Sequence, residues 1–303
     1  MLTTLGLLLT FTQPSPPEKV EVAPQLIAYE KQQLQERNRL NARQKRAEIV
    51  VPTELFAEYK HLHIPAALLN RAFDKANHVP EGFHFDPLNI NKLELTVTEP
   101  FLLERGIKEV VGVGVSNFYG STPNRVQNIM TGLKRYDGKI IPKDGTFSFN
   151  EMLDEIEEEN GYAWAKTILN GKDRWGLGGG ICQVSTNIFR AALNSGMAIK
   201  ERRGHTYNLS KYSPAGLDAT IYKGHQDLQF VNNTPSDVLI RVVRRENYLA
   251  VFFIGTRDRT VTVEKKSHWQ GYDGRMATHW TRTIKKGGIT LSEDFGSNYS
   301  GSY

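Results

Sequence analysis

The stretch Cys182–Asn194 places apolar residues at the spacing of an amphipathic helix. Its apolar stripe consists of Val184, Ile188, Ala191 and Ala192. This spacing predicts a helix with one buried face, and Gly196 is a typical residue just past a helix C-terminus. Residues 124–136 show the same spacing, and Ser121 or Thr122 is suited to cap a second helix there.

Other stretches alternate apolar and polar residues or are rich in β-branched residues, which predicts strands. They are residues 93–98, 110–115, 146–149, 198–202, 218–222, 227–244 and 248–255. The later strands are joined by turns too short for crossover helices, so an antiparallel sheet is expected. The prediction is an α+β fold in which an antiparallel sheet, with strands near residues 199, 219, 228 and 250, packs against the central helix that bears Cys182.

The same pattern divides the chain into four expected segments. Residues 1–24 hold a short apolar stretch, Leu2–Thr12, before a Pro-rich break. This segment is expected to be an export signal with a linker, and the alternatives are a short lipid-facing anchor or a plain apolar start. Residues 25–87 are expected to be a helical N-terminal extension, residues 88–256 the main domain, and residues 257–303 a β extension with a polar tail.

Composition and charge narrow the class of protein. With 39% hydrophobic and 10% aromatic residues, the chain has enough apolar mass to fold, and no apolar run approaches the roughly 18 residues of a membrane span. The net charge of +5 suits a polyanionic neighbour such as a cell wall, an anionic lipid surface or nucleic acid. Residues 31–46 carry six of the basic residues. They form either a solvated helix or an arm that contacts a membrane surface or wall, and without interleaved aromatic residues we expect no nucleic-acid binding.

Cys182 is the sole cysteine among 303 residues, which excludes a disulfide framework and Cys-rich metal sites. It follows a run of three glycines at the predicted start of a helix, where aligned peptide dipoles favour a thiolate. His205 and Asp218 follow near predicted strands. This order is that of transglutaminase-like thiol enzymes, with Cys182 as nucleophile, His205 as general base and Asp218 orienting the imidazole ring. A structural role for all three residues is the alternative.

Several neighbours of Cys182 are candidate substrate-binding residues. They are Gly178, Gly179, Gly180, Gln183, Ser185, Thr186, Trp175 and Tyr207. Either Gln183 or backbone N–H groups of the glycine run are expected to stabilise an oxyanion, and the run is expected to floor a groove lined also by Tyr162 and Trp164. No cofactor is expected. No metal site is expected either, because the histidines at positions 61, 63, 78 and 84 lack carboxylates at ligand spacing.

A set of motifs, spread from about residue 106 to residue 255, resembles the VanW family. The matching residues are Tyr119–Arg125, Phe147–Asn150, Gly161, Tyr162, Gly178–Thr186, Glu201, Arg202, His205, Tyr212, Pro214, Gly216, Asp218–Thr220, Asp227, Leu228 and Phe230. The sequence departs from the family pattern at Arg174–Leu177, where relatives carry an aliphatic residue and Pro, and at Thr206, where relatives carry Ser. The family is named for an accessory protein of vancomycin-resistance clusters. The resemblance implies an extracytoplasmic, cell-envelope protein whose partner is peptidoglycan or another wall polymer.

Two functions are favoured by the sequence, and a structural or partner-docking role is the remaining alternative. The first is a thiol-dependent acyl transferase or peptidase that acts on peptidoglycan peptides or related wall amides through Cys182. The second is a non-catalytic module that binds peptidoglycan or glycan, since aromatic rings stack on sugar faces. The pH dependence of thiol alkylation distinguishes them, because a catalytic cysteine forms its thiolate at lower pH than an ordinary one.

Overall fold

The computed structural model describes residues 62–77, 95, 97–169 and 172–301. The chain divides into two compact units, residues 1–49 and 50–303, and all described residues belong to the second. The expected export signal, the basic segment at 31–46 and the histidines at 61, 78 and 84 lie outside the described residues.

The helices and strands of the described part are mixed along the chain. The helices are α2 (Ala66–Asn77), α3 (Pro100–Glu104), α4 (Pro123–Lys134), α5 (Phe149–Met152) and α6 (Ile181–Asn194), with the 3-10 turn η3 (Ser210–Tyr212). The strands are β1 (Glu109–Asn117), β2 (Ile140–Ile141), β3 (Thr146–Ser148), β4 (Trp164–Leu169), β5 (Lys172–Leu177), β6 (Ala198–Glu201), β7 (Gln229–Val231), β8 (Val238–Arg245), β9 (Tyr248–Gly255), β10 (Thr260–Gln270), β11 (Met276–Lys286) and β12 (Ile289–Tyr299). The paired strands are antiparallel, in the orders β1-β9-β8-β2, β3-β7-β6, β10-β11-β12 and β4-β5.

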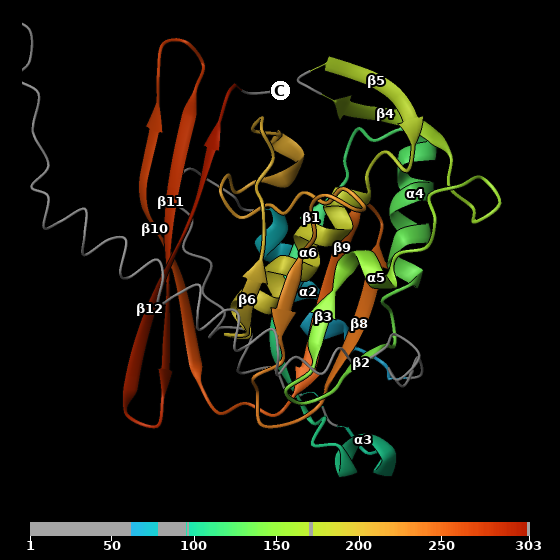
Figure 1. The fold of residues 1–303 in the computed structure, drawn as a ribbon. Coiled ribbons are helices and arrows are strands. Elements are labelled where there is room, and N and C mark those ends of the chain that lie inside the picture. Colours follow the sequence, from blue (N-terminus) through green and yellow to red (C-terminus); the bar gives the residue numbers. More distant parts are fainter. Residues whose placement is uncertain (1–61, 78–94, 96, 170–171, 302–303) are drawn as a thin grey trace, which may run out of the picture. The chain divides into compact units, whose positions relative to one another are not determined.

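Helix α6 lies directly on strand β1 because β1 carries glycine where the two meet (Figure 1). A Cβ atom at Gly112 would lie 2.3 Å from the carbonyl oxygen of Ala191, and one at Gly114 would lie 1.9 Å from that of Asn187. Any larger residue would therefore push the helix away from the strand. The two glycines set the depth at which α6, and the cysteine at its start, sits in the fold.

Polar side chains of α6 take the place of a strand neighbour along β1. Strand β1 is the edge of its sheet, so its outer carbonyl groups need other donors. The donors are Gln183 Nε2 to Asn117 O at 2.7 Å, Arg190 Nη1 to Val115 O at 2.9 Å and Asn194 Nδ2 to Val113 O at 2.8 Å. These bonds fix the register of α6 on the sheet as well as its depth.

Both faces of the β1-β9-β8-β2 sheet are covered. On one face Val251 and Phe253 pack in the core that includes Ile188 of α6. On the other face Phe252 packs in a second core that includes Leu68 and other residues of α2. Strand β9 is therefore buried along its full length.

The long strands β10, β11 and β12, drawn in orange to red in Figure 1, form a three-stranded sheet. Strand β10 of this sheet contacts α6. Arg282 is buried and donates to the carbonyl oxygen of Met197 at 2.9 Å, just past the end of α6. Trp280, also buried, donates from Nε1 to the carbonyl oxygen of Ala215 at 2.9 Å. These contacts attach the sheet to the loop that leads to Asp218.

The structure confirms the α+β class with mainly antiparallel sheets and corrects its arrangement. The predicted single sheet is divided: the strands near residues 199 and 228 belong to β3-β7-β6, whereas the strand near residue 250 belongs to β1-β9-β8-β2. Residues 218–222 are not a strand, since Thr220 makes only an isolated bridge to Arg203. Leu95 and Val97 are buried but not in a strand. Much of the expected polar tail is strand β12.

Within the described ranges, no helix combines the length and apolarity that a bilayer crossing requires.

Candidate functional site

Cys182 is the second residue of α6, and a strained glycine precedes the helix. Gly180 is the residue before the first helical turn, with a φ of +116°, a value that L side chains rarely adopt. The partly buried Sγ of Cys182 lies 3.8 Å from Oγ1 of Thr220 and 3.8 Å from the carbonyl oxygen of Ile221. The backbone N–H of Cys182 is one of the donors in the first helical turn, and no described residue accepts a hydrogen bond from it.

The glycine run packs against the protein's own chain. A Cβ atom at Gly178 would lie 2.5 Å from Cγ2 of Ile156, and one at Gly179 would lie 2.6 Å from the carbonyl oxygen of Lys166. The absence of side chains at these two buried glycines is thus required by residues 156 and 166, and the groove floored by the run stays a prediction. Gly180 is half-buried, and its own close neighbour is Arg125.

His205 and Asp218 are joined by two hydrogen bonds. Nδ1 of the imidazole ring lies 2.6 Å from Oδ2 of Asp218, and the backbone N–H of His205 donates to the same oxygen at 2.7 Å. The side chain of Asp218 is 3% exposed and that of His205 is 14% exposed. The carboxylate therefore fixes both the backbone and the ring of His205, and leaves Nε2 as the nitrogen available for proton transfer.

The second oxygen of Asp218 is held by groups from other elements. Tyr299 on β12 donates its hydroxyl hydrogen to Oδ1 at 2.6 Å, and Nη2 of Arg202 lies 3.3 Å from the same atom. Arg202 also donates from Nε to the backbone carbonyl oxygen of Asp218 at 2.6 Å. Hydrogen bonds and the charges of His205 and Arg202 lower the pKa of Asp218 although burial, the largest single influence, raises it. Asp218 is ionised at neutral pH.

The ionisation of Cys182 and His205 is coupled. Burial raises the pKa of the Cys182 thiol, but the hydrogen bond and the charge of His205 outweigh burial and lower it. Burial lowers the pKa of His205, and the bonds to Asp218 and Cys182 raise it to about 9. The two directions agree with a thiolate beside an imidazolium ring near neutral pH.

The loop between η3 and Asp218 is tied to α6 by one buried arginine. Arg190 donates to the carbonyl oxygens of Leu217 at 2.8 Å, Tyr212 at 2.5 Å and Ser213 at 2.9 Å. Because the same helix carries Cys182 at its start, these bonds relate the position of the thiol to that of the His205–Asp218 pair. The ring of Tyr212 stacks on that of His205 with centroids 4.5 Å apart.

Three predicted substrate contacts have structural roles instead. Gln183, Ser185 and Thr186 are fully buried. Both donor bonds of Gln183 go to β1, to Ser116 Oγ at 2.9 Å and to the carbonyl oxygen of Asn117, so its amide is not available to an oxyanion at the thiol. The hydroxyl groups of Ser185 and Thr186 both donate to the carbonyl oxygen of Ala219. The prediction failed here because helical spacing does not show which polar side chains face a neighbouring strand.

The aromatic candidates differ in exposure. Trp164 and Trp175 are 50% and 66% exposed. In the β4–β5 pairing Trp164 lies opposite Leu177 and Lys166 lies opposite Trp175, so alternation puts both tryptophans and Lys166 on one face of the hairpin. Tyr207 is half-buried, and Tyr162 is buried, which removes Tyr162 from any groove wall.

Sequence reasoning missed four residues of the site. Arg125, Arg202 and Tyr212 stand among the motif residues, but nothing in their spacing indicated their roles. Tyr299 lies outside those motifs in a polar stretch, and only the long-range packing of β12 brings it to Asp218.

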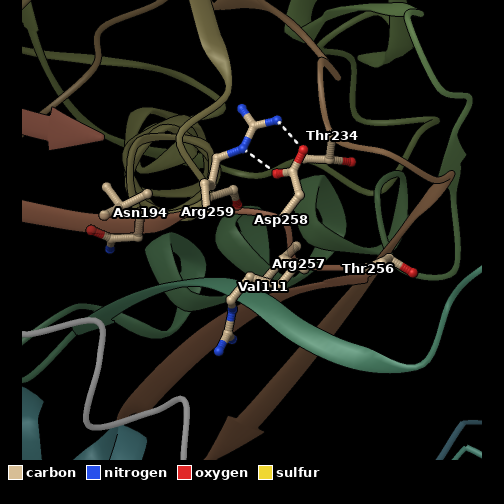
Figure 2. A pocket seen from close by; sticks show the side chains of 9 residues that line it. Val111, Asn194, Thr234, Thr256, Arg257, Asp258 and Arg259 are labelled. Atoms are coloured by element: carbon tan, nitrogen blue, oxygen red, sulfur yellow. Dashed lines mark hydrogen bonds and ion pairs between the residues drawn. The ribbon is translucent and has the colours of Figure 1, made fainter. Parts of the chain in front are cut away.

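A small cavity at the other end of α6 is not a substrate site. Figure 2 shows its lining, which includes Asn194, Thr234 and the ion pair of Asp258 with Arg259. Its volume of about 10 Å³ suits a single water molecule. It begins about 18 Å from Cys182 along the helix, from a rise of 1.5 Å per residue.

The described residues contain no group of three or more His, Cys, Asp or Glu side chains placed to hold a metal ion.

Part of the sequence matches known proteins. The sequence model of the family described as "VanW like protein" matches residues 124–254. A protein of Bacillus subtilis (strain 168), printed as "Uncharacterized protein YoaR", is 37% identical over 134 residues, 44% of this chain and 44% of that protein. The "Vancomycin B-type resistance protein VanW" of Enterococcus faecalis (strain ATCC 700802 / V583) is 32% identical over 115 residues, 37% of this chain and 42% of that protein.

These matches have a limited span. The chain covers less than half the length of both curated relatives. No solved structure matches it. The matched segment contains Cys182, His205 and Asp218, whereas Tyr299 lies beyond it. Residues 124–254 of this chain are thus similar in sequence to the VanW family and to these two relatives.

Proposed function

We propose that the protein is a thiol-dependent acyl transferase or peptidase with Cys182 as nucleophile, His205 as general acid and base, and Asp218 as the residue that orients the imidazole ring. The observation that carries the proposal is the His205–Asp218 bond at 2.6 Å, together with the thiol at the start of α6, whose pKa is lowered by His205. If His205 had only a structural role, nothing would require a thiol at the start of a helix to be near it. The combination is typical of an activated nucleophile.

The first half of the reaction forms a thioester. The thiolate of Cys182 attacks the carbonyl carbon of an amide, and the oxyanion that results is stabilised by the backbone N–H of Cys182 and by the dipole of α6. When the intermediate collapses, the C–N bond breaks and the leaving amine takes a proton from the imidazolium ring of His205. Asp218 compensates the positive charge of the ring while that charge is present.

The second half releases the acyl group. Water or an acceptor amine gives a proton to Nε2 of His205 and attacks the thioester carbon, after which the C–S bond breaks and the thiolate returns. Water makes the enzyme a peptidase, and an amine makes it a transferase. The order of the three residues along the chain, with Cys on a helix and His and Asp after it, supports a transglutaminase-like arrangement as part of this proposal.

The substrate class comes from the family. VanW-family relatives point to a protein of the cell envelope, and one of them carries vancomycin B-type resistance in its name. We therefore place the protein outside the cytoplasm and infer peptidoglycan peptides, or related wall amides, as substrate. The positive net charge of +5 suits such a polyanionic neighbour.

The test uses soluble peptidoglycan fragments and mass spectrometry. Wild-type protein is incubated with the fragments and hydroxylamine, which traps a thioester as a hydroxamate, beside Cys182→Ser, His205→Ala and the control His268→Ala on exposed β10. We expect new products with the wild type and the control, and loss of about 10³-fold or more with the first two variants. Equal product from wild type and Cys182→Ser, or none from any protein, would reject the enzyme.

A non-catalytic glycan-binding module is the second candidate. The common face of Trp164 and Trp175 favours it, since exposed rings at this spacing suit sugar stacking. Binding of peptidoglycan fragments that is lost in Trp175→Ala, together with an inert thiol, would support this candidate over the enzyme.

A further inference from the structure

Arg125 is a buried cation whose partners on the described chain are neutral. It is 8% exposed, and its Nη1 donates to the hydroxyl oxygen of Ser121 at 2.9 Å. Arg125 also lowers the pKa of Tyr212, a neutral phenol. No carboxylate among the described residues pairs with it, although Arg202, Arg259 and Arg282 all have such partners. A buried guanidinium group without an anion is costly, so the arrangement suits an anionic ligand.

Arg125 packs against the residue that precedes the helix carrying Cys182. A Cβ atom at Gly180, two residues before Cys182, would lie 3.0 Å from Cγ of Arg125. Tyr212 relates the two groups, because its ring stacks on His205 while Arg125 acts on the pKa of its phenol. Burial and the charge of Cys182 raise the pKa of Tyr212 to about 12, and the charge of Arg125 opposes them. The charges of Cys182 and Arg125 therefore both act on the pKa of the same phenol, that of Tyr212.

A second cation extends the positive charge toward solvent. Lys211 is exposed and precedes Tyr212 in η3. Burial lowers the pKa of Lys211, and so do the positive charges of Arg125 and Lys166. The neighbouring charges that act on Lys211 are thus cations.

We propose that Arg125 and Lys211 form a carboxylate-binding site beside Cys182, so that the substrate is a peptide with a free carboxylate next to the carbonyl group that is attacked. This inference rests on the proposed function and names its substrate class. A planar guanidinium group matches a carboxylate, and the exposed ammonium group draws the anion in and leaves it partly solvated. The binding energy then positions the amide against the thiolate.

The test compares two alkylating reagents of similar size at the sole cysteine. Iodoacetate and iodoacetamide both form a C–S bond to Cys182 and release iodide, but iodoacetate carries a carboxylate beside the reacting carbon. With an ordinary thiolate iodoacetate is the slower reagent, because like charges repel. The quantity measured is the ratio of the two rate constants, iodoacetate over iodoacetamide, and the urea-unfolded chain supplies the reference ratio.

We expect the folded wild type to show a higher ratio than the unfolded chain. Arg125→Gln should lower the ratio by about tenfold and Arg125→Lys by less, while Lys211→Gln should lower it at least about threefold. Lys265→Gln on exposed β10 removes the same charge far along the sequence and should leave the ratio unchanged. Lys211 is exposed, so its variant decides the question if Arg125→Gln does not fold.

Equal ratios for Lys211→Gln and Lys265→Gln would overturn the carboxylate site. A thiol that reacts slowly with both reagents would reject the proposed enzyme, whereas the ratio alone judges the site, so the two failures are distinguishable. As a second arm, N-acetyl-alanylalanine should slow the iodoacetamide reaction more than its C-terminal amide does. If inorganic phosphate protects Cys182 from iodoacetamide as well as this peptide does, the site binds anions in general. That result would overturn the assignment to a carboxylate.

Discussion

The hydroxyl group of Tyr299 donates a hydrogen bond to Oδ1 of Asp218 at 2.6 Å and accepts one from the backbone N–H of Gly216 at 2.6 Å. Tyr299 is on β12, the last strand of the described chain, whereas Asp218 is in the segment that matches the VanW family. The three-stranded sheet β10-β11-β12 thus supplies a direct partner of the carboxylate that orients His205.

Tyr299→Phe should destabilise the fold by about 1–3 kcal/mol, because it leaves Oδ1 of the buried Asp218 carboxylate with Arg202 alone and the backbone N–H of Gly216 without a partner. Urea unfolding measures the effect. Tyr272→Phe is the matched control, since Tyr272 is fully exposed. Equal midpoints for the two variants would mean that β12 does not support Asp218.

The pH dependence of iodoacetamide labelling should show that the thiolate of Cys182 forms at a lower pH than that of an ordinary cysteine. Because His205 lowers the pKa of Cys182, labelling should reach its plateau below the pH expected for an ordinary thiol of pKa about 8.5. His205→Ala removes the imidazolium charge, so burial then raises the pKa of Cys182. Labelling at pH 7 should fall about tenfold or more, since each pKa unit changes the thiolate fraction tenfold.

His268→Ala serves as the control for this pH series, as His268 is exposed on β10. Its profile should overlay that of the wild type. The raised pKa of His205, about 9, adds an upper limit: above that pH the imidazolium ring loses its proton, and catalysis that needs a general acid declines. If His205→Ala had the same labelling profile as the wild type, His205 would not influence the pKa of Cys182.

The local part of this site could be predicted from the sequence, and the long-range part could not. Helical periodicity and the glycines at 178–180 and 196 locate α6 and put Cys182 at its start. The order Cys, His, Asp along the chain was enough to nominate His205 and Asp218, whose mutual bond the structure contains. This part could be predicted because the position of each residue relative to a helix end or a short strand depends on its neighbours in sequence.

The roles of Gln183 and Tyr299 depend on partners far away in the chain. Gln183 looked like a donor for an oxyanion because it follows the cysteine, yet it bonds to β1 because α6 covers the open edge of that strand. Tyr299 sits in a strand whose composition is largely polar, so no hydrophobic pattern indicated that its ring is buried. The division of the expected sheet has the same origin, since strand pairing is set by packing rather than by alternation alone.

Gly178→Ala should cost more stability than Gly224→Ala. Both glycines have positive φ, +76° and +80°, so both substitutions carry similar backbone strain of about 1–2 kcal/mol. At Gly224 the new Cβ meets nothing within 4 Å, but at Gly178 it would lie 2.5 Å from Ile156. We expect an additional loss of about 1–3 kcal/mol in thermal or urea unfolding of Gly178→Ala. Equal losses would show that the glycine run is needed only for its dihedral angles.

Arg190→Met should show whether the thiol and the His205–Asp218 pair depend on a common support. Arg190 is 5% exposed, and its guanidinium group binds carbonyl oxygens of both β1 and the loop before Asp218. Methionine keeps most of the apolar volume but leaves these buried oxygens without donors, which should cost about 2–4 kcal/mol in urea unfolding. Arg275→Met, on an exposed turn, should cost nothing measurable.

The second readout of Arg190→Met is the pH profile of Cys182 labelling in the variant while it is still folded. Without the guanidinium group, the loop that leads from Tyr212 to Asp218 loses its attachment to α6, so His205 should hold the thiolate less well. The inflection of the profile should then move to higher pH, in the direction of the His205→Ala profile. A variant that loses stability but keeps the wild-type profile would show that Arg190 supports the fold without positioning the site. Arg190→Lys should have a stability and a labelling profile between those of the wild type and Arg190→Met. One ammonium group cannot donate to all the carbonyl oxygens that the planar guanidinium group binds.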